Sequence, residues 1–216
     1  MINVQADWET PAGRLLKQLC AAMPVPVTIV VYGSAPLQMC VEPSLLSQDV
    51  DIYGEEAIRD TVAREKLGVE CRETGIQIGY DINFQAPPNW WSRALIQQVG
   101  HCRVVIPHPY DILVAKLHRA EPKDIEAFRL VIQKTGHPTE IELIQLLQSS
   151  VDMYQPGFDE EKRGDLKSNT MLVWEEIYGR RIDVSVEIIT PALERRKQGW
   201  GHDMPDEDYK SQLRKL

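Results

Sequence analysis

Hydrophobic residues recur along the first half of the chain with two spacings, one typical of strands and one typical of helices. The run VTIVV at residues 27–31 is short, β-branched and fully apolar, which predicts a buried strand. Before it, Thr10 and Pro11 are suited to begin a helix, and leucines at helical spacing extend that helix over residues 11–23. The same patterns predict a short helix from residue 35, a strand over 48–54, an amphipathic helix over 55–67 closed by Gly68, and one or two strands over 69–85.

The second half of the chain is mostly helical in pattern. We expect a strand around residues 104–106 and, before it, a segment that is broken at Pro87 and Pro88 and then turns helical. Further helices are predicted over 109–119, 123–135 (ended by Gly136), 141–151 (begun by a capping box of Thr139 and Glu142), 170–179 and 190–201. The polar stretch 155–169 is the predicted linker. Together these elements predict an α/β (α+β) domain over residues 1–154, with a mixed sheet of four to five strands flanked by helices, and a helical C-terminal extension over residues 155–216.

Composition and charge narrow the class of protein. The formal net charge of −8 argues against a broad basic face that would bind nucleic acid through phosphate contacts alone. No run approaches the ~18 apolar residues of a membrane span, and the acidic, polar start differs from a secretory signal. We therefore expect a cytoplasmic protein without a membrane partner. The four cysteines form no C-x-x-C pair, which favours free thiols over a zinc site or a disulfide framework.

Candidate chemistry lies on the first two predicted strands. The first strand leads into Gly33 and Ser34, where exposed backbone N–H groups and a residue without a Cβ can hold a phosphate. The second carries Asp49 and Asp51, whose side chains point the same way, roughly 6.6 Å apart along the strand, and can share divalent metal ions. Asp81 adds an acid in a later predicted strand. Nucleotidyl transfer needs carboxylates that hold two metal ions about 3.5–4 Å apart, so the pattern predicts a site for a magnesium-bound nucleoside triphosphate.

These motifs resemble those of a known superfamily. The pattern GS…DVD…YD is similar to the nucleotidyltransferases with the polymerase-β-like fold. The run PHPYDILVAKLHRAEPKDIEAF at residues 107–128 resembles the branch of AbiEii-type toxins and related nucleotidyltransferase-like proteins, in which a helix carrying K-L is followed by K-D or R-D. The segment PPNWWSRA at residues 87–94 resembles the same branch, where a proline-rich turn is followed by Trp and then Arg. The similarity spans roughly residues 27–147.

The resemblance implies a fold, a reaction and a set of functional residues. The fold would be polymerase-β-like, and the reaction would move a nucleoside monophosphate from a nucleoside triphosphate to a hydroxyl or phosphate of an acceptor. The acceptor stays open between an RNA such as tRNA, a protein and a small molecule, and the branch also implies the toxin of a toxin–antitoxin pair, with an antitoxin as partner. The implied roles are triphosphate binding by Gly33 and Ser34, binding of Mg²⁺ or Mn²⁺ by Asp49, Asp51 and Asp81, phosphate contact by Lys116, and catalysis by Asp49, Asp51, Lys116 and Asp124.

Other interpretations of the same residues stay open. Lys116 and Asp124 also fit a helix-surface lysine and a favourable first-turn charge on a helix dipole. Residues 46–48 (Leu-Ser-Gln) precede Asp49 where the toxin branch often has an arginine, which keeps open a catalytically inactive nucleotide-binding or interaction module. A D-x-D glycosyltransferase is a third alternative, although the 48 residues before Asp49 leave little room for the nucleotide-binding half that such enzymes usually have first.

Overall fold

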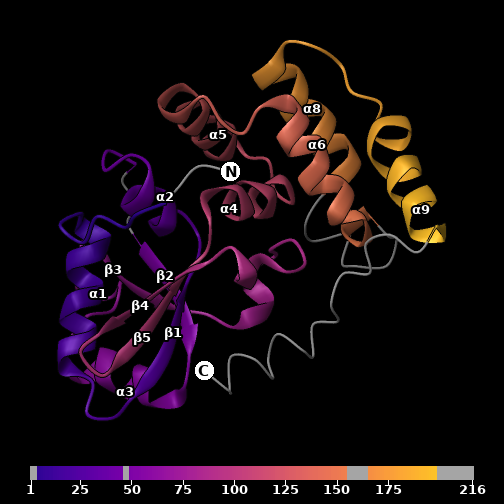
Figure 1. Ribbon diagram of the computed structural model, residues 1–216. Coiled ribbons are helices and arrows are strands. Elements are labelled where there is room, and N and C mark those ends of the chain that lie inside the picture. The colour runs from indigo at the N-terminus through magenta and orange to yellow at the C-terminus, as the bar shows by residue number, and fades with distance from the viewer. Residues whose placement is uncertain (1–3, 46–48, 155–164, 199–216) are drawn as a thin grey trace. The chain divides into compact units, whose positions relative to one another are not determined.

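In the computed structural model, the run VTIVV forms β1 (Val27–Val31), the middle strand of a mixed five-stranded sheet (Figure 1). The strand order is β3-β2-β1-β5-β4, with β1 antiparallel to β2 and parallel to β5. Strand β3 runs parallel to β2, and β4 runs antiparallel to β5. The other strands are β2 (Asp49–Gly54), β3 (Gly75–Ile78), β4 (Leu95–Val99) and β5 (Cys102–Ile106). The predicted α+β class and mixed sheet flanked by helices are confirmed.

The structure describes residues 4–45, 49–154 and 165–198, which belong to two units with separate packing. Of the described residues, 4–45, 49–84 and 93–112 belong to the sheet unit, and 85–92, 113–154 and 165–198 belong to the helical unit. Neither unit begins or ends at residue 154, so the predicted domain boundary there stays a prediction. Residues 46–48 and most of the predicted linker lie outside the described residues.

One face of the sheet carries the hydrophobic core of the sheet unit. Alternate residues of β1 and β2, among them Ile29 and Ile52, are fully buried in it. Leu16 and Leu19 pack into the same core from the helical side and are also fully buried. The helices that contribute to this core are α1 (Pro11–Ala22), α2 (Ala35–Cys40) and α3 (Glu56–Arg64) (Figure 1).

The ends of these helices follow local chemistry. Thr10 caps α1 as predicted, because its side-chain oxygen accepts a hydrogen bond from the backbone N of Gly13 at 3.1 Å. Helix α3 ends at Arg64, so the prediction that it runs to residue 67 and is closed by Gly68 is wrong. Lys66 has a φ of 51°, a left-handed conformation that does not continue an α-helix, and the chain therefore leaves the helix earlier.

The opposite face of the sheet carries the buried side chains of Val30 on β1 and Val105 on β5, together with polar and aromatic side chains on β2. Along β2, Val50 and Ile52 point into the core, whereas Asp49, Asp51 and Tyr53 are partly exposed on the other side. The alternation along this strand therefore puts both predicted metal-binding acids on one face. The main hydrophobic core of the sheet unit, to which Val50 and Ile52 belong, lies on the other face.

The segment before β5 differs from its prediction. Residues 95–99, predicted as helical, form β4, which pairs with β5 through a turn at Gly100 and His101. Leu95 and Val99 pack against the core, and a spacing of four residues puts two side chains on one face of a strand as well as of a helix. The pairing with β5 decides between the two. Helical geometry is limited to a 3-10 turn, η2 (Trp90–Ser92).

The prediction that Asp81 lies in a strand is wrong. Strand β3 ends at Ile78, and the chain then forms a 3-10 turn, η1 (Asp81–Asn83). The side-chain oxygen of Asn83 accepts a hydrogen bond from the backbone N of Tyr80 at 2.8 Å and so closes this turn. Asp81 consequently lies on an exposed turn rather than on the sheet.

Helices form the described part of the helical unit. Helix α4 (Pro109–Leu117) begins in the sheet unit and ends in the helical unit. The predicted stop at Gly136 and the predicted capping box of Thr139 and Glu142 are confirmed. No helix within the described ranges is long and apolar enough to cross a membrane. The other helices of this unit are α5 (Pro122–Thr135), α6 (Glu140–Ser149), α8 (Leu166–Tyr178) and α9 (Thr190–Lys197), with a 3-10 turn η3 (Val151–Tyr154) and a π-helical turn η4 (Ser185–Ile189).

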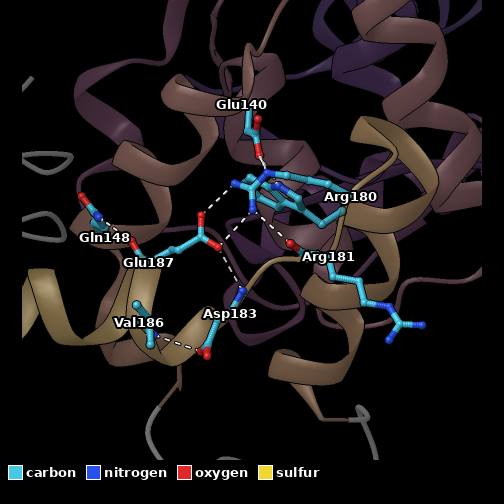
Figure 2. Close-up of polar contacts among 8 residues, drawn as sticks. Glu140, Gln148, Arg180, Arg181, Asp183, Val186 and Glu187 are labelled. Atoms are coloured by element: carbon cyan, nitrogen blue, oxygen red, sulfur yellow. Dashed lines mark hydrogen bonds and ion pairs between the residues drawn. The ribbon is translucent and has the colours of Figure 1, made fainter.

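An ion-pair network around Arg180 ties three of these elements together (Figure 2). The Arg180 guanidinium pairs with Glu140 at the start of α6, and with both carboxylate oxygens of Glu187 in η4, at 3.0 and 2.7 Å. Glu140 also accepts a hydrogen bond from the indole N–H of Trp174 in α8, at 2.7 Å. The pKa of Arg180 is raised above its ordinary value, chiefly by the hydrogen bond to Glu187 and, to a smaller extent, by Glu140. The network therefore stabilises the packing of α6, α8 and η4.

Candidate functional site

The turn after β1 and the acidic strand β2 meet at Gly33 and Asp51. The backbone N of Tyr32 donates to the carbonyl of Asp51 at 2.9 Å, which continues the pairing of the two strands. Gly33 follows with a φ of +67°, in the left-handed region that favours glycine. A Cβ at Gly33 would lie 2.2 Å from Oδ2 of Asp51, so this carboxylate occupies the space that a side chain would fill. The glycine thus allows an acid to lie directly against the turn.

Asp49 lies on the same face of β2, two residues before Asp51. Both acids are partly exposed. Burial raises the pKa of Tyr32 to about 12, and the negative charges of Asp51 and Asp49 contribute to the same shift. Both carboxylates therefore act on one buried phenol next to Gly33, and the structure brings the predicted turn and the predicted acid pair together within one unit.

Ser34 is the N-cap residue that precedes α2. Its backbone carbonyl accepts a hydrogen bond from Gln38 N at 3.1 Å, but its side chain makes no capping hydrogen bond to the helix. The Ser34 hydroxyl is therefore not used as a helix cap. The contact between Ser34 and a phosphate stays a prediction.

Within the described residues, no third acid joins Asp49 and Asp51. No three His, Cys, Asp or Glu side chains in those ranges come together as a group that could hold a metal ion, and Asp81 lies on its exposed turn. On the neighbouring strand, Gln77 of β3 pairs with Asp51, so a neutral amide lies where another strand acid could have been. The donor set consists of two carboxylates from one strand. Mg²⁺ often binds through one or two carboxylates, with substrate phosphates and water as the other ligands.

Lys116 and Asp124 are brought together in the helical unit. The Lys116 ammonium donates to Asp124 at 2.9 Å, and the Arg119 guanidinium donates to both oxygens of Asp124 at 2.8 Å each. The backbone N of Glu121 donates to the same carboxylate at 3.2 Å, which completes a capping box at the start of α5. The side chain of Lys116 is 9% exposed and that of Asp124 is 1% exposed.

This arrangement decides what Asp124 can do chemically. Burial by itself would raise the pKa of Asp124, but Arg119 and Lys116 outweigh it and hold this pKa below its ordinary value. An ionised carboxylate with four hydrogen-bond donors is a poor proton acceptor at neutral pH. Asp124 is therefore suited to orient Lys116 and Arg119 rather than to move a proton. Both predicted residues lie in a different unit from Gly33, Ser34, Asp49, Asp51 and Asp81.

A buried ion pair in the sheet unit was not predicted from the sequence. Arg93 donates to Asp111 through Nε, at 3.1 Å to each oxygen, and through Nη2 at 2.7 Å. Asp111 is fully buried at the start of α4, and burial raises its pKa to about 6 although Arg93 opposes the shift. The arginine of the PPNWWSRA segment and the acid of PYD were the only signals for it, and 18 residues separate the two partners.

Comparison of the chain with protein-family models, with curated proteins and with solved structures gave no match. The resemblance to nucleotidyltransferases therefore rests on the sequence motifs.

Proposed function

We propose that the protein is a metal-dependent nucleotidyltransferase of the polymerase-β-like kind, and that its sheet unit binds a magnesium-bound nucleoside triphosphate. The observation that supports this best is the contact between the Asp51 carboxylate and Gly33 at the end of β1. Asp49 lies on the same face of β2. A phosphate at the Gly33 turn and a cation at the two acids would then be neighbours, which is the arrangement that a metal–triphosphate complex requires.

The residues present fit a hard divalent cation. Asp49 and Asp51 offer only carboxylate oxygens, which suit Mg²⁺ or Mn²⁺ better than softer metals. When bound, such an ion would neutralise charge on the phosphates and activate the attacking hydroxyl. The two acids would hold the ion, and Gly33, which has no Cβ, lets the Asp51 carboxylate lie directly against the turn at which the phosphates would bind.

The roles of Lys116 and Asp124 in this proposal come from the resemblance alone. Lys116 would contact phosphate, and Asp124, which accepts a hydrogen bond from Lys116 at 2.9 Å, would position it. The acceptor is proposed to be an RNA, a protein or a small molecule with a hydroxyl or phosphate group. A place as the toxin of a toxin–antitoxin pair is part of the same proposal.

A second candidate is a nucleotide-binding module without transferase activity. The observation that favours it is the donor set of only two carboxylates, because no group of three potential ligands occurs in the described residues. Two acids are enough to bind a metal–triphosphate complex. They supply fewer fixed ligands for the pair of ions that nucleotidyl transfer commonly uses.

Calorimetric titration with Mg²⁺ and ATP tests the binding step. We expect Asp51→Asn and Asp49→Asn each to weaken binding at least tenfold, because each removes a negatively charged metal ligand. Asp60→Asn is the matched control, since Asp60 is an exposed acid on α3 in the same unit. Equal affinity of wild type, Asp51→Asn and Asp60→Asn, or a preference for a sugar nucleotide over ATP, would overturn the proposal.

Incubation with α-labelled nucleotides and cell extract tests the transfer step. A labelled acceptor that forms with wild type, and not with Asp49→Ala, supports the nucleotidyltransferase. Tight Mg–ATP binding without any labelled product under the same conditions supports the binding module instead. Lys116→Ala in the same assay tests the predicted phosphate contact, with Lys123→Ala as the control, because Lys123 is an exposed lysine in the same helical unit.

A further inference from the structure

Three aromatic side chains lie beside the acid pair in the sheet unit. Tyr53 follows Asp51 by two residues on β2 and so shares its face of the sheet. The ring of Tyr32 lies 5.9 Å from the ring of Tyr53 and 6.0 Å from that of Phe84, tilted at 48° and 31° respectively. We call Tyr32, Tyr53 and Phe84 the aromatic cluster. Tyr32 is its buried member, at 8% exposure, whereas Tyr53 and Phe84 are partly exposed.

The aromatic cluster is held in place by its surroundings. The Tyr32 hydroxyl packs so closely on Gly79 that a Cβ there would lie 2.0 Å from it. Gly79 is itself fixed by a hydrogen bond from its backbone N to the carbonyl of Ile52 at 2.9 Å. Phe84 is held by the η1 turn, where its backbone N donates to the carbonyl of Asp81 at 3.1 Å. Rings that are already ordered lose little conformational entropy when a further ring stacks on them.

The aromatic cluster lies apart from the main core of the sheet unit. That core lies on the other face of the sheet, where Val50 and Ile52 of β2 point, and none of the three rings belongs to it. The acid pair lies next to the cluster, because the charges of Asp51 and Asp49 both act on the Tyr32 phenol. Planar apolar surface next to a proposed metal–phosphate site is suited to a planar ring that is attached to the phosphates.

We propose that the aromatic cluster takes the nucleobase of the nucleoside triphosphate whose phosphates lie at Gly33 and Asp51, with Tyr53 and Phe84 as the stacking residues. This inference rests on the proposed function. Stacking uses the π-face that every base has, so it supplies affinity with little base preference. Purines offer more surface than pyrimidines, and ATP and GTP therefore bind somewhat more tightly than CTP and UTP.

Titration of the full chain with Mg–ATP and with Mg–tripolyphosphate, which lacks a base, tests this assignment. Tyr53→Ala and Phe84→Ala are each expected to weaken ATP binding roughly 5- to 150-fold, the range that corresponds to the loss of about 1–3 kcal/mol for one base–aromatic stack. Both variants leave the affinity for tripolyphosphate unchanged, because the phosphate and metal contacts are intact. Tyr53→Phe restores most of the ATP affinity, since it keeps the ring.

The outcomes separate the two proposals. If Tyr53→Ala weakens ATP and tripolyphosphate equally, or weakens neither, the base lies elsewhere and this inference is overturned while the proposed nucleotide site stands. If wild type binds neither probe, the proposed function fails and the base assignment fails with it. Circular dichroism and urea denaturation of each variant show whether a lost affinity reflects unfolding, and Phe84→Ala gives an independent reading if Tyr53→Ala does not fold.

Discussion

The contact between Gly33 and Asp51 leads to a prediction that depends on both backbone conformation and side-chain space. Gly33→Ala adds a Cβ at a φ of +67°, where it would lie 2.2 Å from Oδ2 and 3.1 Å from Cγ of Asp51. The left-handed conformation costs an alanine about 1–2 kcal/mol. Moving the carboxylate to an ordinary contact distance forces Asp51 away from its preferred rotamer, which adds about 0.5–1.5 kcal/mol. We expect Gly33→Ala to lower the free energy of unfolding by about 2–3 kcal/mol.

Gly100 offers a matched control in the same unit. It has a φ of +58°, and a Cβ there would meet only the carbonyl oxygen of Cys20, at 3.5 Å, which is an ordinary contact. Gly100→Ala therefore carries the conformational cost without the displaced carboxylate. The gain that alanine brings by restricting the unfolded chain is common to both variants and cancels in the comparison. The difference between the two variants, about 1 kcal/mol, isolates the contact with Asp51.

Urea denaturation measures the energetic cost of the contact between the added Cβ and Asp51. The variants to compare are Gly33→Ala, Gly100→Ala, Asp51→Ala and the double variant Gly33→Ala/Asp51→Ala. The double variant should be less destabilised than the sum of its parts, because Asp51→Ala leaves only the Cβ of residue 51 near the new methyl group, at 3.3 Å. Mg–ATP affinity should fall in Gly33→Ala and stay unchanged in Gly100→Ala. Equal destabilisation by the two glycine variants, together with simple additivity in the double variant, would refute the proposed packing of Asp51 against the turn.

Three further predictions follow from the ion pairs. Asp124→Asn leaves the buried Lys116 ammonium without a carboxylate and should cost about 3 kcal/mol at pH 7; because the folded-state pKa of Asp124 is lowered, the variant and wild type should converge in stability as the pH falls below about 4. The pKa of Asp111 is raised to about 6, so the folded protein binds a proton at this carboxyl more readily than the unfolded chain does. The free energy of unfolding of wild type, relative to that of Asp111→Asn, should therefore rise by about 1 kcal/mol from pH 7 to pH 5. Parallel pH profiles of the two proteins would contradict this. Arg180→Ala should cost about 1 kcal/mol in thermal or urea unfolding, whereas Arg181→Ala, which loses only an exposed pair at 3.7 Å, should change stability by less than about 0.5 kcal/mol.

Signals that act within a few residues of each other were sufficient to predict many elements from the sequence. The apolar run at 27–31 forms a buried strand, Thr10 caps α1, and Gly136 and Thr139 mark the end of α5 and the start of α6. In each case the physical cause is local, such as a hydrogen bond to a neighbouring turn or a backbone conformation that glycine adopts without strain. The side-chain alternation that puts Asp49 and Asp51 on one face of β2 is also a local property, and it was therefore predicted correctly.

Tertiary structure decided the rest. The spacing of Leu95 and Val99 suits a helix and a strand equally, and only the pairing with β5 makes the segment a strand. The partnership of Arg93 with Asp111 joins residues 18 positions apart, and Asp51 meets Gly33 across two strands that approach each other only in the folded sheet. Such contacts depend on where the backbone brings distant segments, whereas periodicity and capping depend only on neighbours along the chain. The sequence by itself therefore determined which residues are candidates for the proposed nucleotide site, and the fold determined which of them meet.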